Sequence, residues 1–505
     1  MEPTEKAVVV ARKRPAGRKT NKFVLLLRPV ETFMKNFLAH GALHGITYLG
    51  MSLLHGIEKL MWLALIMIAV YFCGLLSLES WERFQTKSTV VTIEKDHYYW
   101  NISMPSLTIC PMNRIDEKLF HQFCDKNYIH DSEDKEELFA FIESLANSTY
   151  MNFGNIKGSQ NVDRILSMLR IQPKDYMSLI ANLTEDLTRR DDQELRVRSQ
   201  NNLEYIRTMQ TLTEYGICYT TNNLIAPNLT TSQLLRGHPP EEDYFYRNHK
   251  LHDVRFGNLF DGDVTYSFIG FDTPISVFYH SPYEMMNIAR YQPYSKEAYE
   301  FEAYSIEIVT GADFQDDTSV SQRACRFSFE SNLTHYGIYT KGICLQECRL
   351  KMAYQHCGCI PHFYPNNIPH PKPVCDYKTL RACFPKHEEL FLEFRENAKS
   401  VNCYCEQNCV DSKVVIEKMQ ILTGTRKLLG SNGGLVIMKR YPLIRFNRQV
   451  LFTFTDLLAF FRFPFFFAVS IGGTAGFFLG FSVLGAVEII YFFTLRLIWY
   501  ILGRR

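Results

Sequence analysis

The chain has 505 residues, and 46% of them are hydrophobic, which is enough for a large globular domain besides any membrane part. Its net charge of +2 hides an asymmetry, because residues 1–57 hold nine Lys or Arg against three acids and residues 496–505 add three Arg. The rest of the chain is therefore acidic, which argues against nucleic-acid binding. Basic ends are typical of cytoplasmic tails under the positive-inside rule.

The first segment, 1–57, is predicted to be a cytoplasmic tail. Its opening, ARKRPAGRKT, is basic and has no apolar run of the kind that a cleaved signal peptide contains. We interpret the basic run as a solvated tail in preference to a specific lipid-binding site. The apolar, small-residue stretch NFLAHGALHGITYLG then leads toward the first predicted membrane span.

Two stretches are apolar enough to cross a bilayer. Residues 60–78 carry no charge, and they predict a first transmembrane helix over 58–79. Residues 463–495 predict a second one, and this run of 33 residues has one ionisable side chain, Glu488, and five glycines. A carboxylate inside the membrane costs about 2.5 kcal/mol or more. A plain anchor needs neither this acid nor so many glycines.

Two spans place both ends of the chain on the same side of the membrane, and the basic tails place that side in the cytoplasm. The region 80–462 is then one extracellular domain. Thirteen of the fourteen cysteines lie between positions 110 and 409, and all five Asn-x-Ser/Thr sequons lie in the predicted domain. This joint pattern indicates an oxidised, glycosylated region. The predicted glycosylation sites are Asn101, Asn147, Asn182, Asn228 and Asn332.

Local patterns predict a mixed α+β domain. Alternating or β-branched runs predict strands within 88–111, 217–220, 264–280, 303–310 and 434–455. Polar segments with helical periodicity predict helices near 116–146 and 162–210. Strands that flank helical insertions favour an α+β architecture over a repeat or barrel.

Ten cysteines between 325 and 409 predict a disulfide ladder. Cys344 and Cys348 fall on one face of a predicted helix, about 6 Å apart, and Cys403 and Cys405 are a similar distance apart in an extended segment. Matching spacings predict two antiparallel rungs, with Cys325 and Cys409 closing the base. The expected pairs are Cys110–Cys218, Cys325–Cys409, Cys344–Cys405, Cys348–Cys403, Cys357–Cys383 and Cys359–Cys375.

Cys124 has no partner in this scheme. The Cys-x-Cys pairs are also compatible with zinc binding, but ten cysteines in an oxidising compartment favour disulfides. A stack of disulfide rungs makes a stiff lever that does not depend on a large core.

Several motifs together resemble the epithelial sodium channel/degenerin/acid-sensing ion channel family. They cover the chain from about 40 to 495, and as a set they are specific. The motifs are Leu43-His44-Gly45-Ile46, Met104-Pro105-Ser106-Leu107-Thr108-Ile109-Cys110, Tyr339 followed by Cys344-x3-Cys348-x8-Cys357-x-Cys359, Ile471-Gly472-Gly473, and Gly480-Phe481-Ser482. Within the family the chain is most similar to the bile-acid-sensitive branch.

The resemblance implies a homotrimeric, amiloride-sensitive, sodium-selective channel of the plasma membrane, without a cofactor. It implies that Gly480, Phe481 and Ser482 form the pore constriction and that Glu488 lines the pore below it. His44 and Gly45 would lie in a re-entrant segment, and Gly472 and Gly473 in the gating part of the second span. It also implies a finger over about 110–218, a thumb over about 325–409, and bile acids as modulators.

Departures from the family pattern argue against ordinary proton gating. The chain has Tyr491 where the proton-sensing members carry a second acid, and Ser470 where they carry an acid before Ile-Gly-Gly. The run before Cys325 lacks the aromatic residue that those members have. Asp456, above the second span, is a candidate Ca²⁺ ligand if three copies form a ring, because hard cations prefer oxygen ligands.

Two other classes of two-span protein need sequence features of their own. A two-span ectoenzyme, such as a cell-surface nucleotidase, needs a catalytic motif, and we find no HExxH, GxSxG or Walker-type loop. A channel gated by ATP needs clustered basic residues for phosphate, which the sequence does not mark. The sodium-channel hypothesis therefore leads.

Overall fold

The fold was obtained as a computed structural model. It describes residues 33, 37, 45–51, 53–86, 89–94, 101–186, 196–199, 202–205, 208–236, 256–257, 264–269, 275–288, 298–311, 314, 318–396, 399–422, 433–450, 465–480 and 482–501. Two units are distinguished: an apolar helical unit, residues 1–88 with 452–505, and a disulfide-bonded unit, residues 89–451.

The apolar helical unit contains the predicted spans. Its longest element, α3 (Gly56–Thr86), is the one helix among the described residues that is long and apolar enough to cross a bilayer alone. Two further segments, 471–479 and 484–499, meet the same criterion as a pair and bend by 78° at the break between them. The remaining helices are α2 (Ile46–Gly50), α15 (Phe465–Leu479), α16 (Val483–Tyr491), the π-helical η11 (Phe492–Arg496) and α17 (Leu497–Ile501).

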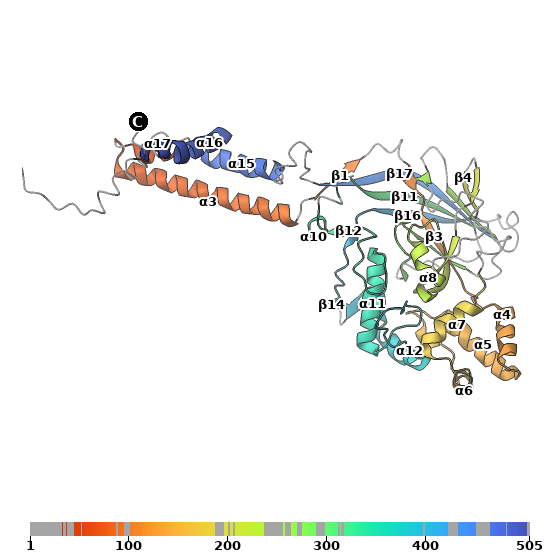
Figure 1. Cartoon of the computed structure of the whole chain (residues 1–505). Helices are drawn as coiled ribbons and strands as arrows, with labels where there is room; N and C mark the ends of the chain where they lie inside the picture. Colours follow the sequence, from red (N-terminus) through yellow and green to blue (C-terminus); the bar gives the residue numbers. More distant parts are fainter. Residues whose placement is uncertain are drawn as a thin grey trace, which may run out of the picture. The chain divides into compact units, whose positions relative to one another are not determined.

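Helix α15 runs alongside α3 (Figure 1). The rings of Phe72 on α3 and Phe478 on α15 stack with their centroids 6.3 Å apart. Most other apolar side chains of α3 are exposed in the single chain. A helix satisfies its own backbone hydrogen bonds, so this exposed apolar surface suits a lipid environment.

The disulfide-bonded unit is built on a seven-stranded sheet in which β17 is central. Strand β11 pairs with β17 in parallel and with β16 in antiparallel register, and β1 pairs with β17 from Thr89↔Val450 to Glu94↔Arg445. Its strands are β1 (Thr89–Glu94), β4 (Arg196–Ser199), β5 (Asn202–Tyr205), β9 (Val264–Ile269), β11 (Ala298–Thr310), β16 (Asp411–Leu422) and β17 (Gly433–Val450).

A second, four-stranded sheet has the order β10-β3-β7-β6. Every residue of β3 and β7 is buried, as expected for central strands covered on both faces. These strands are β3 (Ser106–Pro111), β6 (Thr208–Thr213), β7 (Gly216–Thr221) and β10 (Ile275–His280). Short pairs are β2 (Ile102–Ser103) with β8 (Phe256–Gly257), β12 (Cys325–Arg326) with β15 (Gln407–Asn408), and β13 (Arg395–Glu396) with β14 (Lys399–Ser400).

Two groups of helices share the main hydrophobic core. The first group is α4 (Glu117–Lys126), α5 (Ser132–Ala146), η2 (Phe153–Asn155), α6 (Gln160–Met168), η3 (Pro173–Asp175) and α7 (Tyr176–Leu183). The second is α11 (Lys341–Cys357), α12 (Tyr377–Cys383), η9 (Phe384–His387) and α13 (Glu388–Glu393). Figure 1 shows α12 next to the first group. Shorter helices are η5 (Ala226–Leu229), α8 (Thr231–Arg236) and α10 (Val320–Arg323).

Aromatic side chains bind the two helical groups together. Tyr150, which lies between α5 and η2, stacks on Phe391 of α13 with ring centroids 5.0 Å apart, and Phe141 of α5 contacts Tyr377 at 5.3 Å. All four rings are buried. Such pairs add about 0.5–1.5 kcal/mol each beyond the burial of their area.

The expectation of a mixed fold rich in disulfides is confirmed, but the helical prediction over 162–210 is wrong in its second half. Residues 196–199, 202–205 and 208–213 are strands. Strand β4 pairs with β9, whose residues lie more than sixty positions further along the chain. The periodicity of a polar segment does not reveal a partner that distant, so tertiary pairing overrides the local helical signal.

Candidate functional site

The second apolar stretch breaks at the predicted constriction. Helix α15 ends at Leu479, and Gly480 has a left-handed φ of +63° while its amide still donates to the carbonyl of Gly476 at 3.0 Å. An L side chain is strained in this conformation, so glycine is suited to end a helix there. The last carbonyls of α15 consequently have no following turn of helix to satisfy them.

A new helix begins two residues later. Ser482 has extended backbone angles, and its Oγ accepts a hydrogen bond from the amide of Gly485 at 3.0 Å, which makes it the N-cap of α16. Phe481, between the two helices, lies outside the described residues. The sequence Gly-Phe-Ser is therefore a helix stop followed by a helix start, and backbone groups become available at the break.

Glu488 lies on α16, about 9 Å along the helix axis from Ser482. Its side chain is exposed in the single chain. It makes no hydrogen bond or ion pair with any part of the chain that the structure describes. A carboxylate on such an apolar helix needs water or a polar partner. The exposed side chain of Glu488 is accessible to both.

Gly472 and Gly473 lie inside α15, away from the break. A Cβ atom added at either position would meet no described atom within 4 Å in the single chain. Neither glycine has a side chain, so another helix can approach the backbone closely here, as it does at small residues in membrane proteins.

The predicted re-entrant segment also contains a glycine with a positive φ, as the second apolar stretch does at Gly480. Gly45 has a φ of +84° and forms the N-cap of α2. A Cβ atom here would lie 3.2 Å from Ile66 on α3, and the rings of Tyr48 and Trp62 stack beside it at 4.3 Å. Gly45 therefore allows α2 to pack closely on the first predicted span. His44 lies outside the described residues.

Sequence reasoning missed an aromatic cluster in the same unit. Phe33 and Phe37 contact Phe492 of η11 with ring centroids 5.1 and 5.0 Å apart, and Phe33 and Phe492 are buried. Arg496 lies over the Phe492 ring at 4.5 Å. The cluster joins the N-terminal segment to the end of the second apolar stretch, and no local pattern marks a contact between such distant positions.

The disulfide-bonded unit contains the six expected cysteine pairs, two of which the matching spacings predicted. Its bonds are Cys110–Cys218, Cys325–Cys409, Cys344–Cys405, Cys348–Cys403, Cys357–Cys383 and Cys359–Cys375. Two rungs join α11 to an extended segment, with Cα atoms 5.8 and 5.9 Å apart, as the matching of helical and extended spacings requires. Cys124 is a buried free thiol, and Cys73 on α3 is also free.

Four of the sequon asparagines are exposed: Asn101, Asn182, Asn228 and Asn332. Asn147 differs, because it caps the end of α5 and is half-buried. The four exposed positions are thus accessible for a glycan, while Asn147 needs local rearrangement to accept one.

A buried ion pair, also missed from the sequence, fixes α11 to the turn between β6 and β7. The guanidinium of Arg349 donates to both carboxylate oxygens of Glu214, with one contact at 2.7 Å, and both side chains are 2% exposed. The hydroxyl of Tyr364 donates to the same carboxylate at 2.5 Å and contacts the Tyr150 hydroxyl at 2.9 Å. The pair is 135 positions apart in sequence, so only the fold reveals it.

The start of α11 is held by a second carboxylate. Glu284 accepts hydrogen bonds from Thr340, from the amide of Gly342 at 3.1 Å and from Asn408 at 3.0 Å. Burial raises the pKa of Glu284, and these hydrogen bonds to the charged form oppose the shift. A carboxylate at a helix N-terminus is favoured by the helix dipole.

No group of His, Cys, Asp or Glu within the described ranges has the arrangement of a metal site. Asp456, the candidate Ca²⁺ ligand, lies outside those ranges. The described residues therefore offer a broken apolar helix with one carboxylate in one unit, and a disulfide-bonded unit without a metal-binding group.

Comparison with known proteins agrees with this chemistry. A family model described as "Amiloride-sensitive sodium channel" matches residues 37–492, which include both apolar stretches and the cysteine-rich region. The chain belongs to the amiloride-sensitive sodium channel family. Members of this family are ion channels and not enzymes, so the ectoenzyme hypothesis is not favoured.

Individual relatives are more distant. Pickpocket protein 28 of Drosophila melanogaster is 23% identical over 200 residues, which is 35% of this chain and 30% of the relative. Sodium channel protein Nach of Drosophila ananassae is 24% identical over 189 residues, 35% of this chain and 34% of the relative. Pickpocket protein 11 of Drosophila melanogaster is 32% identical over 92 residues, 18% and 16% respectively. The chain thus spans about a third or less of the length of these relatives.

Proposed function

We propose that this chain is the pore-forming subunit of an amiloride-sensitive, sodium-selective cation channel of the plasma membrane. The observation that carries the proposal is the helix break at Gly480 and Ser482, with Glu488 on the helix that follows, in a member of the amiloride-sensitive sodium channel family. A pore needs a narrow point lined by backbone or hydroxyl oxygens and a polar wall. An anchor needs neither.

In this proposal α3 is the first span, and the bent pair of segments 471–479 and 484–499 is the second, so that both ends of the chain are cytoplasmic. The disulfide-bonded unit is extracellular. Three copies surround one axis, and the open faces of Gly472 and Gly473 admit a neighbouring helix.

Selectivity follows from the groups at the break. Dehydrated Na⁺ passes a ring of backbone oxygens supplied at 480–482, and three copies of Glu488 favour cations below it. The Ser482 hydroxyl accepts a hydrogen bond from the Gly485 amide, which stabilises the start of α16, and the oxygen of a hydroxyl has a second lone pair for another contact. Replacing Gly480 disturbs the backbone, and replacing Ser482 disturbs the cap.

The proposed stimulus is an extracellular ligand, with bile acids as candidates from the family resemblance and Ca²⁺ as a candidate inhibitor at Asp456. The disulfide ladder transmits movement because its rungs keep α11 and its partner segment as one body. Strands β1 and β17 follow and precede the two spans in sequence and pair with one another. They therefore offer a direct route from the sheet to the pore.

The test is a voltage-clamp recording from cells that express the full chain. We expect an amiloride-blocked Na⁺ current, and we expect Gly480→Cys and Ser482→Cys each to lower the Na⁺/K⁺ permeability ratio severalfold. Gly74→Cys is the matched control, because Gly74 is a glycine of α3 with open space beside it, and it should leave the ratio unchanged. An unchanged ratio in both break variants would refute the filter assignment.

The bile-acid and calcium parts are tested separately on the same cells. We expect a bile acid to increase the amiloride-sensitive current and removal of extracellular Ca²⁺ to do the same. A current that responds to neither would leave a sodium channel with another stimulus. Absence of current under any condition, with the protein present at the surface, would overturn the channel proposal itself.

A further inference from the structure

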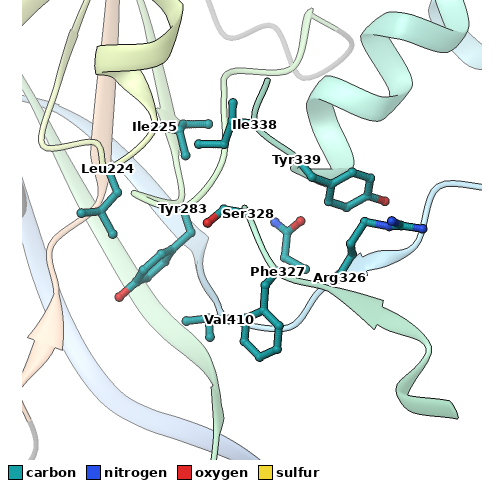
Figure 2. Close-up of a pocket in the computed structure, with 10 residues that line it drawn as sticks. Leu224, Ile225, Tyr283, Arg326, Phe327, Ser328, Ile338, Tyr339 and Val410 are labelled. Carbon is teal, nitrogen blue, oxygen red and sulfur yellow. The ribbon is translucent and has the colours of Figure 1, made fainter. Parts of the chain in front are cut away.

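A pocket of about 240 Å³ lies at the point where residues 325–409, called here the ladder segment, join the rest of the disulfide-bonded unit (Figure 2). One part of its wall, which includes Leu224, Tyr283 and Val410, lies outside the ladder segment. The other part, which includes Ser328 and Ile338, belongs to it. A molecule bound there would contact both bodies at once.

The pocket lies beside both ends of the ladder segment, where the chain enters it at Cys325 and leaves it at Cys409. Strands β12 and β15 lie in parallel there, and a disulfide links Cys325 of β12 to Cys409, which directly follows β15. Helix α11 begins just after Ile338, at Lys341. The pocket therefore lies at the hinge of the lever that the disulfide rungs stiffen, where small changes in packing have the greatest effect on its direction.

Most of the wall is apolar, but it carries the hydroxyl of the exposed Ser328 and that of the half-buried Tyr283. Figure 2 shows Ile225 and Ile338 on one side, Tyr283, Val410 and Phe327 on the other, and Ser328 between them. The side-chain hydroxyls of Tyr283 and Ser328 form no hydrogen bond with any described residue. A ligand that leaves these groups unpaired loses affinity, so one polar atom on the ligand is favoured at Ser328.

The charged side chain on the wall, Arg326, lies near a carboxylate and donates from Nη1 to the Glu330 carbonyl at 3.0 Å, although its Nε forms no hydrogen bond with the described residues. The Arg326 guanidinium lies 3.5 Å from the Glu406 carboxylate and 5.2 Å from the centre of the Tyr339 ring, and Figure 2 shows it directed away from Ser328. The amide of Asn408 is also occupied, because it accepts from Lys341 at 2.8 Å and donates to Glu284 at 3.0 Å. A charged ligand would therefore be desolvated without a counter-charge, and the pocket favours a neutral one.

The volume restricts the ligand further. At about 30 Å³ for each water, the pocket has the volume of about eight water molecules. Pockets for drug-sized ligands measure about 300–1,000 Å³. The pocket is thus smaller than the usual site of a drug-sized ligand, which favours a molecule smaller than a steroid acid.

We propose that this hinge pocket binds a small uncharged amphipathic molecule, a phenol or a branched alcohol. Its apolar body packs against Leu224, Ile338 and Val410, and its hydroxyl bonds to Ser328. By joining the two walls, the bound molecule holds the ladder segment against the four-stranded and seven-stranded sheets. The proposal that the molecule binds depends only on the pocket. The proposal that the bound molecule changes a sodium current rests on the proposed channel function.

Binding is tested by protection of a cysteine on intact cells that express the full chain. Ser328→Cys is labelled with a cationic methanethiosulfonate reagent, with 4-isopropylphenol as the probe. We expect the probe to slow labelling at least threefold. Phe329→Cys is the matched control: Phe329 is the next residue, is 62% exposed and is not part of the pocket wall, so its labelling rate should not change.

Two further arms decide the interpretation. The same aromatic body as an anion, 4-isopropylbenzoate, should not protect Ser328→Cys, and Ile338→Trp, which fills the pocket, should abolish protection by the phenol. Saturation-transfer NMR of the phenol with the detergent-solubilised chain, with and without Ile338→Trp, reads the same contact without an added cysteine. Equal slowing at positions 328 and 329, protection by the benzoate, or an NMR contact that survives Ile338→Trp would overturn the proposal.

The channel recording separates this proposal from the proposed function. Protection and NMR contact without any sodium current would leave the pocket intact and refute the channel. An amiloride-sensitive current in cells where the phenol neither protects Ser328→Cys nor contacts the chain by NMR would refute the pocket and leave the channel. Where both hold, the phenol should shift the activation of the current in the parent chain and not in Ile338→Trp.

Discussion

At the scale of single residues, Glu347 on α11 is a buried carboxylate that the fold stabilises in its charged form. Burial raises its pKa, but the carboxylate accepts hydrogen bonds from the amides of Thr334 and His335 at 3.0 and 3.2 Å and lies 3.1 Å from the Lys351 ammonium. The net result is a pKa lowered to about 2. The His335 ring is also close, with Nδ1 at 3.7 Å from the carboxylate.

This lowered pKa predicts a specific dependence of stability on pH. Because the folded pKa is below the unfolded value of about 4.3, the charged Glu347 stabilises the fold by about 3 kcal/mol at neutral pH. The contribution is lost as pH falls from about 4.3 toward 2. We expect Glu347→Gln to lower the thermal midpoint of the solubilised chain at pH 7, and the gap to the parent chain to shrink on acidification.

The measurement is a set of melting curves between pH 7 and pH 3. Glu393→Gln is a suitable control, since the Glu393 side chain is 59% exposed and its ion pair with Arg395 adds little. A gap between Glu347→Gln and the parent chain that stays constant over this range would contradict the prediction.

At the scale of elements, the Arg349–Glu214 pair joins α11 to the turn between β6 and β7. Removing one partner leaves a buried charge without compensation, so we expect Arg349→Met to cost about 3–5 kcal/mol. The double variant Arg349→Met with Glu214→Leu should recover much of this loss, because it removes both charges. Thermal melting and surface biotinylation of the full chain report the effect.

An exposed ion pair provides the matched control. Arg164 on α6 donates to both oxygens of Asp134 at 2.7 and 2.8 Å, but its side chain is 64% exposed. Arg164→Met should therefore cost less than about 1 kcal/mol. Similar losses in Arg349→Met and Arg164→Met would mean that the buried pair does not hold these elements together.

The same elements show what a sequence can reveal. The rungs Cys344–Cys405 and Cys348–Cys403 follow from the matching spacings of a helix and an extended segment, whereas the constriction at Gly480 and Ser482 was implied by the family resemblance. Strands β4 and β5 lie in a region that was predicted as helix; they form a local hairpin, and only the pairing of β4 with β9, far along the chain, adds that hairpin to the sheet. Phe33 and Glu214 gave no signal, since each acts through a contact that only folding creates.

At the scale of the whole molecule, the proposed trimer makes a prediction about Glu488. An isolated carboxylate on an apolar helix is costly, but three copies around a water-filled axis are hydrated and attract cations together. Its side chain is exposed and free of hydrogen bonds and ion pairs with the described residues of its own chain, which is what such a ring requires. The number of copies that carry the charge should then set the single-channel conductance.

Linked genes that encode three subunits in one chain test this directly. With one, two or three copies of Glu488→Gln, we expect the Na⁺ conductance to fall in three steps, because each substitution removes one of three equivalent charges from the pore. Placing the single substitution in the first, second or third subunit should give the same conductance, since the copies are related by symmetry. Conductance that depends on the position of the variant subunit, or that is unchanged with all three copies replaced, would show that Glu488 does not form a ring around the pore.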